Sequence, residues 1–195
     1  MDSERDDSAP GAGSPDTGST GTLRAELAGL LALGLLLGAA AYGWAVIGPG
    51  NPVYALMVAA GTFGLGPWIG KPVEHRAPQR WFQVRPSERR ILKLLGVPGF
   101  DTLLERSGWN RAVADPMRSF DGTRSDLPNL ERHLRGTMSA HGTAFLVHLV
   151  LSLLAAAAGH PAGALWILLP GVLIHLYPTL LQRWTYLRIQ PLLPC

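Results

Sequence analysis

Charged side chains and cysteine are both scarce in this chain of 195 residues. Asp, Glu, Lys and Arg make up 16% of it, against about 25% in an average soluble domain, so the surface of an ordinary soluble enzyme would be poorly solvated. The single cysteine excludes a disulfide framework and any zinc or iron–sulfur site built on cysteines. The length suits one compact unit and leaves no room for two catalytic domains.

Several catalytic signatures are absent as well. The sequence has no His-x4-Asp box, no GxSxG elbow, no P-loop, no HExxH motif and no pair of carboxylates at helical spacing inside an apolar run. We therefore expect no metal and no cofactor. Nucleic-acid binding is not expected either, because eight acidic residues interrupt the basic stretch from Lys71 to Arg135 and apolar runs flank it.

Four apolar runs are the main feature that the chain does have. They cover residues 27–47, 53–69, 143–158 and 162–181. About 20 apolar residues, each rising about 1.5 Å along a helix, cross the hydrocarbon core of a bilayer. The second run is shorter and rich in glycine, so it is either a span or a re-entrant segment, and we favour a span. Glycine- and proline-containing turns join the runs in pairs, which predicts an all-α integral membrane protein with four transmembrane helices in two hairpins.

The predicted organisation has four parts. They are a disordered acidic tail (1–22), a first transmembrane hairpin (23–70), a basic segment with interfacial helices (71–142), and a second hairpin with a C-terminal tail (143–195). The basic segment holds 13 of the 17 Lys and Arg residues, whereas the turns at 48–52 and 159–161 hold none. The positive-inside rule therefore places the basic segment and both termini on the cytoplasmic side of the cell membrane.

Short helices are expected inside the basic segment. Ser87 can cap a helix over 88–95 that Gly96 ends, and Trp81 and Phe82 can anchor in the headgroup layer. A second helix is expected over 100–106. A third begins near Leu127 and can continue directly into the third span.

Two histidines lie inside the last two spans. His148 is about seven residues into the third span and His175 about seven residues before the end of the fourth, so an antiparallel hairpin brings them to a similar depth. Imidazole takes up a proton near neutral pH, so one of them can act as a general base on a substrate hydroxyl. The other interpretation is that each histidine only bonds a neighbour and holds the bundle together. For two histidines at matched depth we favour function.

Cationic side chains offer further candidates. Arg85, Arg89, Arg90 and Lys93 either bind phosphate groups or only face anionic lipid, and the second interpretation is favoured. Gln182 and Arg183 either orient a substrate or simply end the fourth helix at the membrane interface.

Three segments carry a resemblance to a known family. They are RWFQVRPSERRILKLLGVPGF (80–100), AFLVH (144–148) and HLYPTLLQRWTYLRI (175–189). Over roughly residues 68–189 the chain resembles a bacterial membrane family typified by glycosyl-4,4'-diaponeurosporenoate acyltransferase. The resemblance implies that a fatty acyl group is moved from an acyl donor to a hydroxyl of a glycosylated carotenoid or similar glycolipid. With it we assign His148 and His175 as catalytic, and the substrate-binding candidates are Trp81, Phe82, Arg85, Gln182, Arg183 and Arg188.

The sequence also departs from the family pattern. Phe145 stands where the family has Glu, His175 where it has Asn, and residues 184–186 differ as well. The competing hypothesis is therefore a non-catalytic scaffold or lipid-binding protein with a decayed site. A proton or solute pathway through the histidines is a weaker alternative that would need a homo-oligomer, and the oligomeric state stays open.

Overall fold

The computed structural model describes residues 17–193, and their side chains from Gly21 onward. Every helical or extended element in this part of the chain is a helix, which confirms the all-α prediction. In chain order these are α1 (Thr17–Val46), α2 (Pro52–Ile69), α3 (Lys71–Arg76), η1 (Gln79–Trp81), α4 (Glu88–Leu94), α5 (Val97–Arg106), η2 (Asn110–Ala114), α6 (Asp115–Arg118), η3 (Arg124–Asp126), α7 (Leu127–Ala157), α8 (Pro161–Pro170), η4 (Gly171–Leu176), α9 (Tyr177–Ile189) and η5 (Gln190–Leu192).

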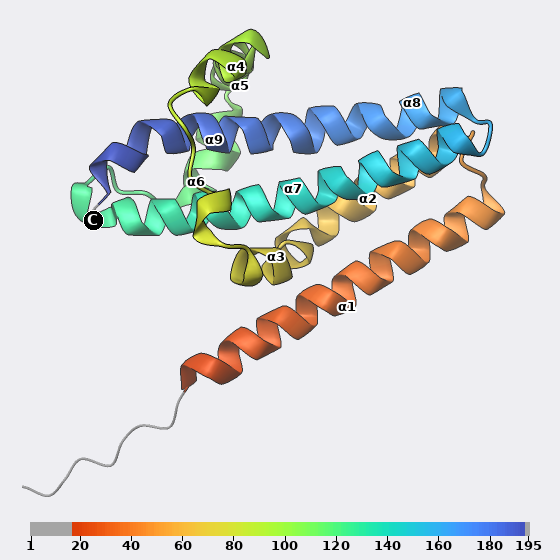
Figure 1. Cartoon of the computed structure of the whole chain (residues 1–195), viewed down its shortest axis with the longest axis horizontal. Coiled ribbons are helices and arrows are strands. Elements are labelled where there is room, and N and C mark those ends of the chain that lie inside the picture. Colours follow the sequence, from red (N-terminus) through yellow and green to blue (C-terminus); the bar gives the residue numbers. More distant parts are fainter. Residues whose placement is uncertain (1–16, 194–195) are drawn as a thin grey trace, which may run out of the picture.

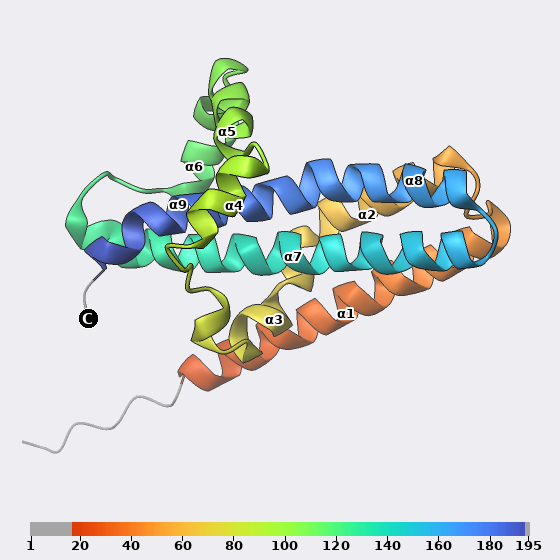
Figure 2. The same cartoon turned by 45° about the horizontal axis from the view of Figure 1, so that its top comes forward.

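Within the described residues, four helical stretches are long and apolar enough to cross a membrane, as predicted. They form two hairpins whose tight turns lie at the same end of the bundle (Figures 1 and 2). Glycines with positive φ, Gly48 at 88° and Gly159 at 83°, make these turns possible. The turns also touch, since a Cβ on Gly163 would run into the carbonyl of Pro49. The hairpins are thus aligned, and both carry their charged ends on the other side.

The first helix begins earlier than expected. Residues 17–22, which we assigned to the tail, form the first turns of α1, because adding turns to an existing helix is far easier than nucleating one. The rest of the predicted tail, residues 1–16, lies outside the described residues. Glu26 of α1 pairs with Arg76 of α3 at 2.6 Å, which ties this helix to the charged end.

The third span is one long helix, whereas the fourth contains an irregular stretch. As expected, α7 runs without a break from Leu127 into the third span. The fourth span is continuous from α8 to α9 but passes through η4, a π-helical stretch that directly follows Pro170. Proline has no N–H to donate, so the regular hydrogen-bond ladder is interrupted there. This stretch carries His175.

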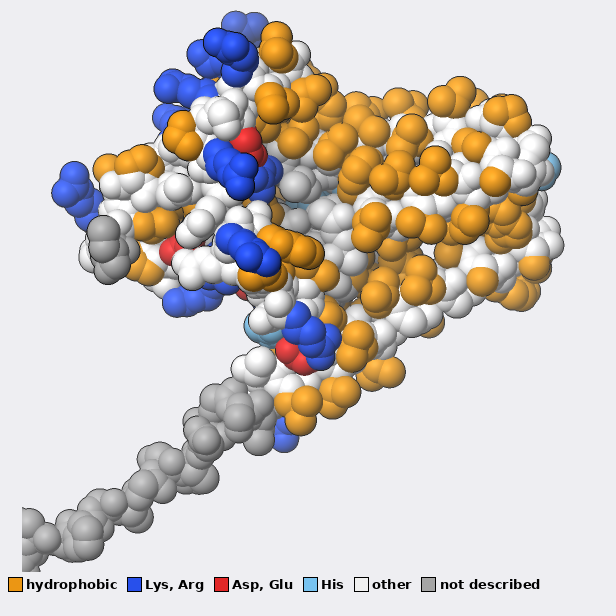
Figure 3. Space-filling model, in the orientation of Figure 1, with side chains coloured by type: hydrophobic (Ala, Val, Ile, Leu, Met, Phe, Trp, Pro, Cys, Tyr) orange, Lys and Arg blue, Asp and Glu red, His pale blue; other side chains and the backbone are white. Residues whose placement is uncertain are grey.

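The charged end of the bundle is structured rather than a loose linker. Figure 3 shows Lys and Arg gathered there, while hydrophobic side chains cover the remaining length. Helices α4 and α5 project from this end (Figure 2) and pack through Leu92 and Val97 on Leu181 of α9. Gly96, in the left-handed region at φ 73°, separates α4 from α5 as predicted.

Two expectations for this region are wrong. Ser87 makes no capping hydrogen bond with its side chain, and Glu88 Oε1 accepts from the Arg85 N–H instead. Phe82 is not a headgroup anchor, because it is buried in a cluster with Leu134 and Tyr186. Trp81 next to it is 63% exposed, as an anchor in the headgroup layer would be.

Candidate functional site

A chain of hydrogen bonds links three histidines and one threonine inside the bundle. His141 Nδ1 of α7 lies 3.1 Å from His175 Nδ1 of η4. His175 Nε2 lies 3.0 Å from Thr62 Oγ1 of α2, which is 3.1 Å from His148 Nε2 of α7. His148 Nδ1 ends the chain at 2.7 Å from the carbonyl oxygen of Ile167. Three of the four spans therefore supply polar groups to one line of contacts.

The partners decide where the protons of this chain lie. A carbonyl only accepts, so His148 donates from Nδ1 and its Nε2 in a neutral ring accepts from the Thr62 hydroxyl. The Thr62 oxygen then accepts from His175 Nε2, and His175 Nδ1 accepts from His141 Nδ1. All donors point the same way, from His141 toward His148. The remaining acceptor of the neutral chain is Nε2 of His141.

Burial differs along the chain. His148 is 0% exposed and His175 1%, and Thr62 is fully buried as well. His141 is only half-buried. The histidine pair predicted from matched depth is therefore brought together, with ring centroids 5.4 Å apart, but its members reach the surface only through His141.

Close helix packing positions His148. A Cβ added to Gly171 would lie 2.5 Å from the His148 Cβ, so only glycine lets η4 approach α7 this closely. Gly171 donates its N–H to the Leu168 carbonyl rather than to that of Ile167, its α-helical partner. One turn further along α7, Ser152 donates to the Ala164 carbonyl at 2.8 Å. These contacts hold the imidazole edge against α8.

Sequence reasoning missed Thr62 and did not assign a role to His141. Thr62 is a lone threonine in the second apolar run, and a buried threonine in a span more often bonds its own helix. It does reach the Val58 and Ala59 carbonyls, at 2.9 and 3.0 Å. The usable signal was the hydroxyl's depth, which matches that of the histidines only once the two hairpins are aligned.

A groove of about 300 Å³ lies on α7, between α3 and α9, and none of the three histidines lines it. Thr179 at its edge donates to the His175 carbonyl at 2.9 Å. Among the predicted substrate-binding residues, Trp81, Phe82 and Arg183 line it. Ser139, Gly142, Thr143 and Leu146 of α7 form its floor. The structure thus gathers three of the six candidates at one place.

Arg183 is held by protein partners. It donates from Nε and Nη2 to Glu88 Oε2, at 3.0 and 2.7 Å, and from Nη1 to the Trp81 carbonyl at 3.2 Å. The guanidinium thereby fixes the segment before α4 on α9. Gln182 is buried beside it, and its Oε1 has no hydrogen-bond partner within residues 21–193.

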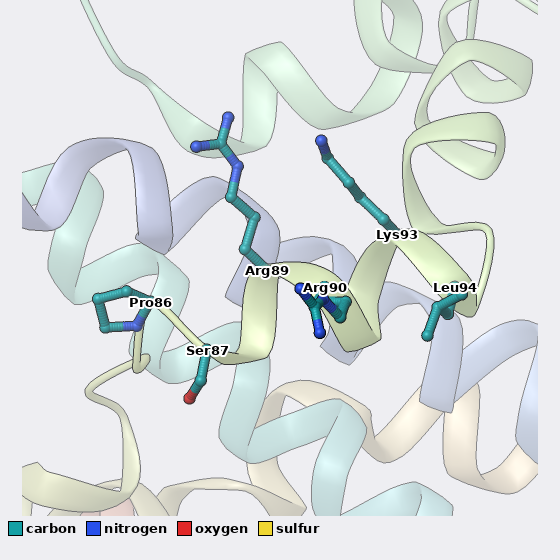
Figure 4. A pocket seen from close by; sticks show the side chains of 6 residues that line it. All are labelled: Pro86, Ser87, Arg89, Arg90, Lys93 and Leu94. Atoms are coloured by element: carbon teal, nitrogen blue, oxygen red, sulfur yellow. The ribbon is translucent and has the colours of Figure 1, made fainter.

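The other two candidates lie elsewhere. Arg85 and Arg188 are exposed and do not line the groove. Near Arg85, α4 forms an open basic concavity of about 670 Å³ lined by Arg89, Arg90 and Lys93. Figure 4 shows Arg89 and Lys93 extending from the same side of α4. Within residues 21–193 these three cations pair with no carboxylate, and no cluster of His, Cys, Asp and Glu suits a metal ion.

The sequence of this chain matches the model of a known protein family. The family model of glycosyl-4,4'-diaponeurosporenoate acyltransferase matches residues 78–194, more than half of the chain. The chain belongs to this family. No curated protein and no solved structure matches it.

The matched range covers most of the site but not all of it. It includes the three histidines, Trp81 and Arg183, whereas Thr62 precedes it. Phe145, where the resemblance described above implies a Glu, is half-buried and takes no part in the hydrogen-bond chain. In this acyltransferase-family protein the Ile167 carbonyl, rather than a carboxylate, orients His148.

Proposed function

We propose that this protein moves a fatty acyl group to a hydroxyl of a glycosylated carotenoid or similar glycolipid, using the chain from His141 to His148 as its base. The single observation that supports this is the directed order of donors, which leaves one free acceptor at the accessible end. Charged and polar groups inside a membrane protein are costly, and three imidazoles in one line are best explained by proton transfer.

His141 is the residue that meets the substrate in this proposal. His148 matches the family motif, but a side chain with no exposed surface cannot touch an acceptor hydroxyl. His141 Nε2 takes the proton of the hydroxyl, and each member of the chain passes one proton onward. His148 ends as an imidazolium that still donates from Nδ1 to the Ile167 carbonyl.

Thr62 can serve both states of His148. With neutral His148 its hydroxyl donates to Nε2 of that ring. Once His175 has passed on its Nε2 proton, the hydroxyl donates back to His175 Nε2, and its oxygen accepts from Nε2 of protonated His148. The acceptor oxygen forms a bond to the acyl carbon, the bond from that carbon to the donor breaks, and the leaving group takes the proton back along the chain. Atoms and charge balance over the cycle.

The proposed substrate contacts follow the geometry. Trp81, Phe82 and Arg183 line the groove, and Gln182, next to Arg183 in the sequence, is buried. Arg85 and Arg188 are assigned to the lipid surface instead, because they are exposed at the charged end. We place that end and both termini in the cytoplasm on the positive-inside rule.

Lipid and pigment mass spectrometry of a deletion strain tests the proposal. If one class of acylated glycolipid disappears, its unacylated precursor accumulates, and the wild-type gene alone restores the profile, the reaction and its acceptor are identified. Complementation with His148→Ala and His141→Ala should fail although both proteins reach the membrane. Unchanged profiles in the deletion strain would overturn the acyltransferase assignment.

A second candidate function is a non-catalytic lipid-binding or scaffold protein. The observation that favours it is that the buried polar groups of the chain bond one another, together with Phe145 in place of the family's Glu. Under this hypothesis His148→Ala lowers the unfolding temperature, and the lipid profile of the deletion strain matches that of its parent.

A further inference from the structure

We propose that the groove on α7 binds the fatty acyl chain and that its floor limits the length of that chain. This inference rests on the proposed acyl transfer and adds the part of the substrate that the groove recognises. The hydrogen-bond chain supplies a base, but nothing in it can tell one acyl chain from another.

The size and lining of the groove favour an alkyl chain over a larger ligand. Its volume of about 300 Å³ is at the low end for small-molecule sites, so it can take a chain segment and not a whole glycosylated carotenoid. Val73, Phe82, Met138 and Leu146 give it an apolar wall. Each methylene that a ligand buries raises its affinity about fourfold, so an apolar wall binds an alkyl chain more tightly the more methylenes it covers.

An unpartnered hydroxyl gives the chain a direction. Ser139 lines the groove and is 3% exposed, and within residues 21–193 its Oγ has no hydrogen-bond partner. A buried hydroxyl without a partner costs free energy, and an acyl carbonyl that accepts a hydrogen bond from it would recover that free energy. Ser139 lies toward the charged end of α7 and Leu146 two turns toward the other end. The carbonyl therefore sits near the interface, with the alkyl chain running toward the membrane interior.

Gly142 is the point at which the groove can be filled. It lies on the floor between Ser139 and Leu146, and a Cβ there would meet nothing within 4 Å. A leucine at this position therefore starts into open space, and its side chain takes up room in the groove. Gly64 of α2 provides a matched control, because its Cβ would also meet nothing within 4 Å and it does not line the groove.

The first measurement is the chain-length distribution of the acylated lipid in the deletion strain complemented with each variant. Gly142→Leu should shift the product toward shorter chains, lowering the ratio of long to short chains about 15-fold, because it displaces about two methylenes. Gly64→Leu should leave the ratio unchanged. Equal ratios for wild type and Gly142→Leu would overturn the inference while leaving the acyltransferase function intact.

A second measurement does not depend on activity. The purified full-length protein is photolabelled with a diazirine-bearing fatty acid, and the labelled peptides are mapped. Labelling should concentrate on residues 138–146 and fall in Gly142→Leu but not in Gly64→Leu. Label that is spread over the spans, or equally reduced in both variants, contradicts the groove. Labelling at 138–146 in a protein that shows no acyl transfer would overturn the proposed function but support the binding of an acyl chain in the groove. Thr143→Met, which fills the same hollow, replaces Gly142→Leu if that variant fails to accumulate.

Discussion

Gly171 and His148 pack so closely that a Cβ on the glycine would lie 2.5 Å from the Cβ of the imidazole side chain and 2.8 Å from its Cγ. Gly171→Ala should therefore destabilise the protein by about 1–3 kcal/mol, as overpacked sites do. The sign is diagnostic, because alanine otherwise stabilises a helix by roughly 1 kcal/mol relative to glycine. Thermal unfolding in detergent micelles measures the change.

Gly64→Ala is the matched control for that experiment. Its Cβ would lie in open space, so only the helix-propensity gain remains. If Gly171→Ala raises the unfolding temperature as Gly64→Ala does, η4 does not press on His148 and the geometry of the site is wrong.

Thr62 provides the sharpest test of the hydrogen-bond chain. Thr62→Val keeps the shape and removes the hydroxyl, so proton transfer between His175 and His148 is interrupted. We expect kcat to fall about 10²-fold, within the range of general acid–base catalysis, with KM little changed because Thr62 touches no substrate. Thr62→Ser keeps the hydroxyl and should retain most of the activity. Equal loss in both variants would point to packing rather than to proton transfer.

The four spans and the position of the two histidines could be predicted from the sequence because both depend on counting. An uncharged apolar run of about 20 residues predicts a membrane span, and the depth of a residue in that span follows from the helical rise per residue. His148 and His175 were matched in this way. Neither prediction depends on which faces of the helices pack against each other.

The contacts of Thr62, Phe82 and Arg183 could not be predicted because their partners are distant in the sequence. Thr62 meets His148 only where α2 packs on α7, and Arg183 meets Glu88 95 positions away. Phe82 resembles an interfacial anchor until the bundle folds over it and Arg135 lies 4.9 Å from its ring centroid. For Phe82 and Arg183 the sequence suggested two roles each, and the tertiary packing selected between them; Thr62 was given no role until the helices were packed.

The ion pair between Arg183 of α9 and Glu88 of α4 should stabilise the fold, and its loss should lower the unfolding temperature. Both side chains are partly buried, and two N–H groups of Arg183 reach one Glu88 oxygen. A double-mutant cycle with Arg183→Gln and Glu88→Gln should give a coupling energy of about 1 kcal/mol in thermal unfolding, above that of a typical exposed pair. Additive effects of the two substitutions would show that the pair contributes nothing.

Cysteine accessibility tests the predicted orientation. In a Cys195→Ser background, Ala158→Cys beside the second turn should react with a membrane-impermeant maleimide on intact cells. Glu105→Cys on α5 should react only after the membrane is opened; both parent residues are exposed. The positive-inside rule predicts this pattern because the turns carry no Lys or Arg. The opposite pattern would place the charged end outside the cell and would overturn the predicted orientation.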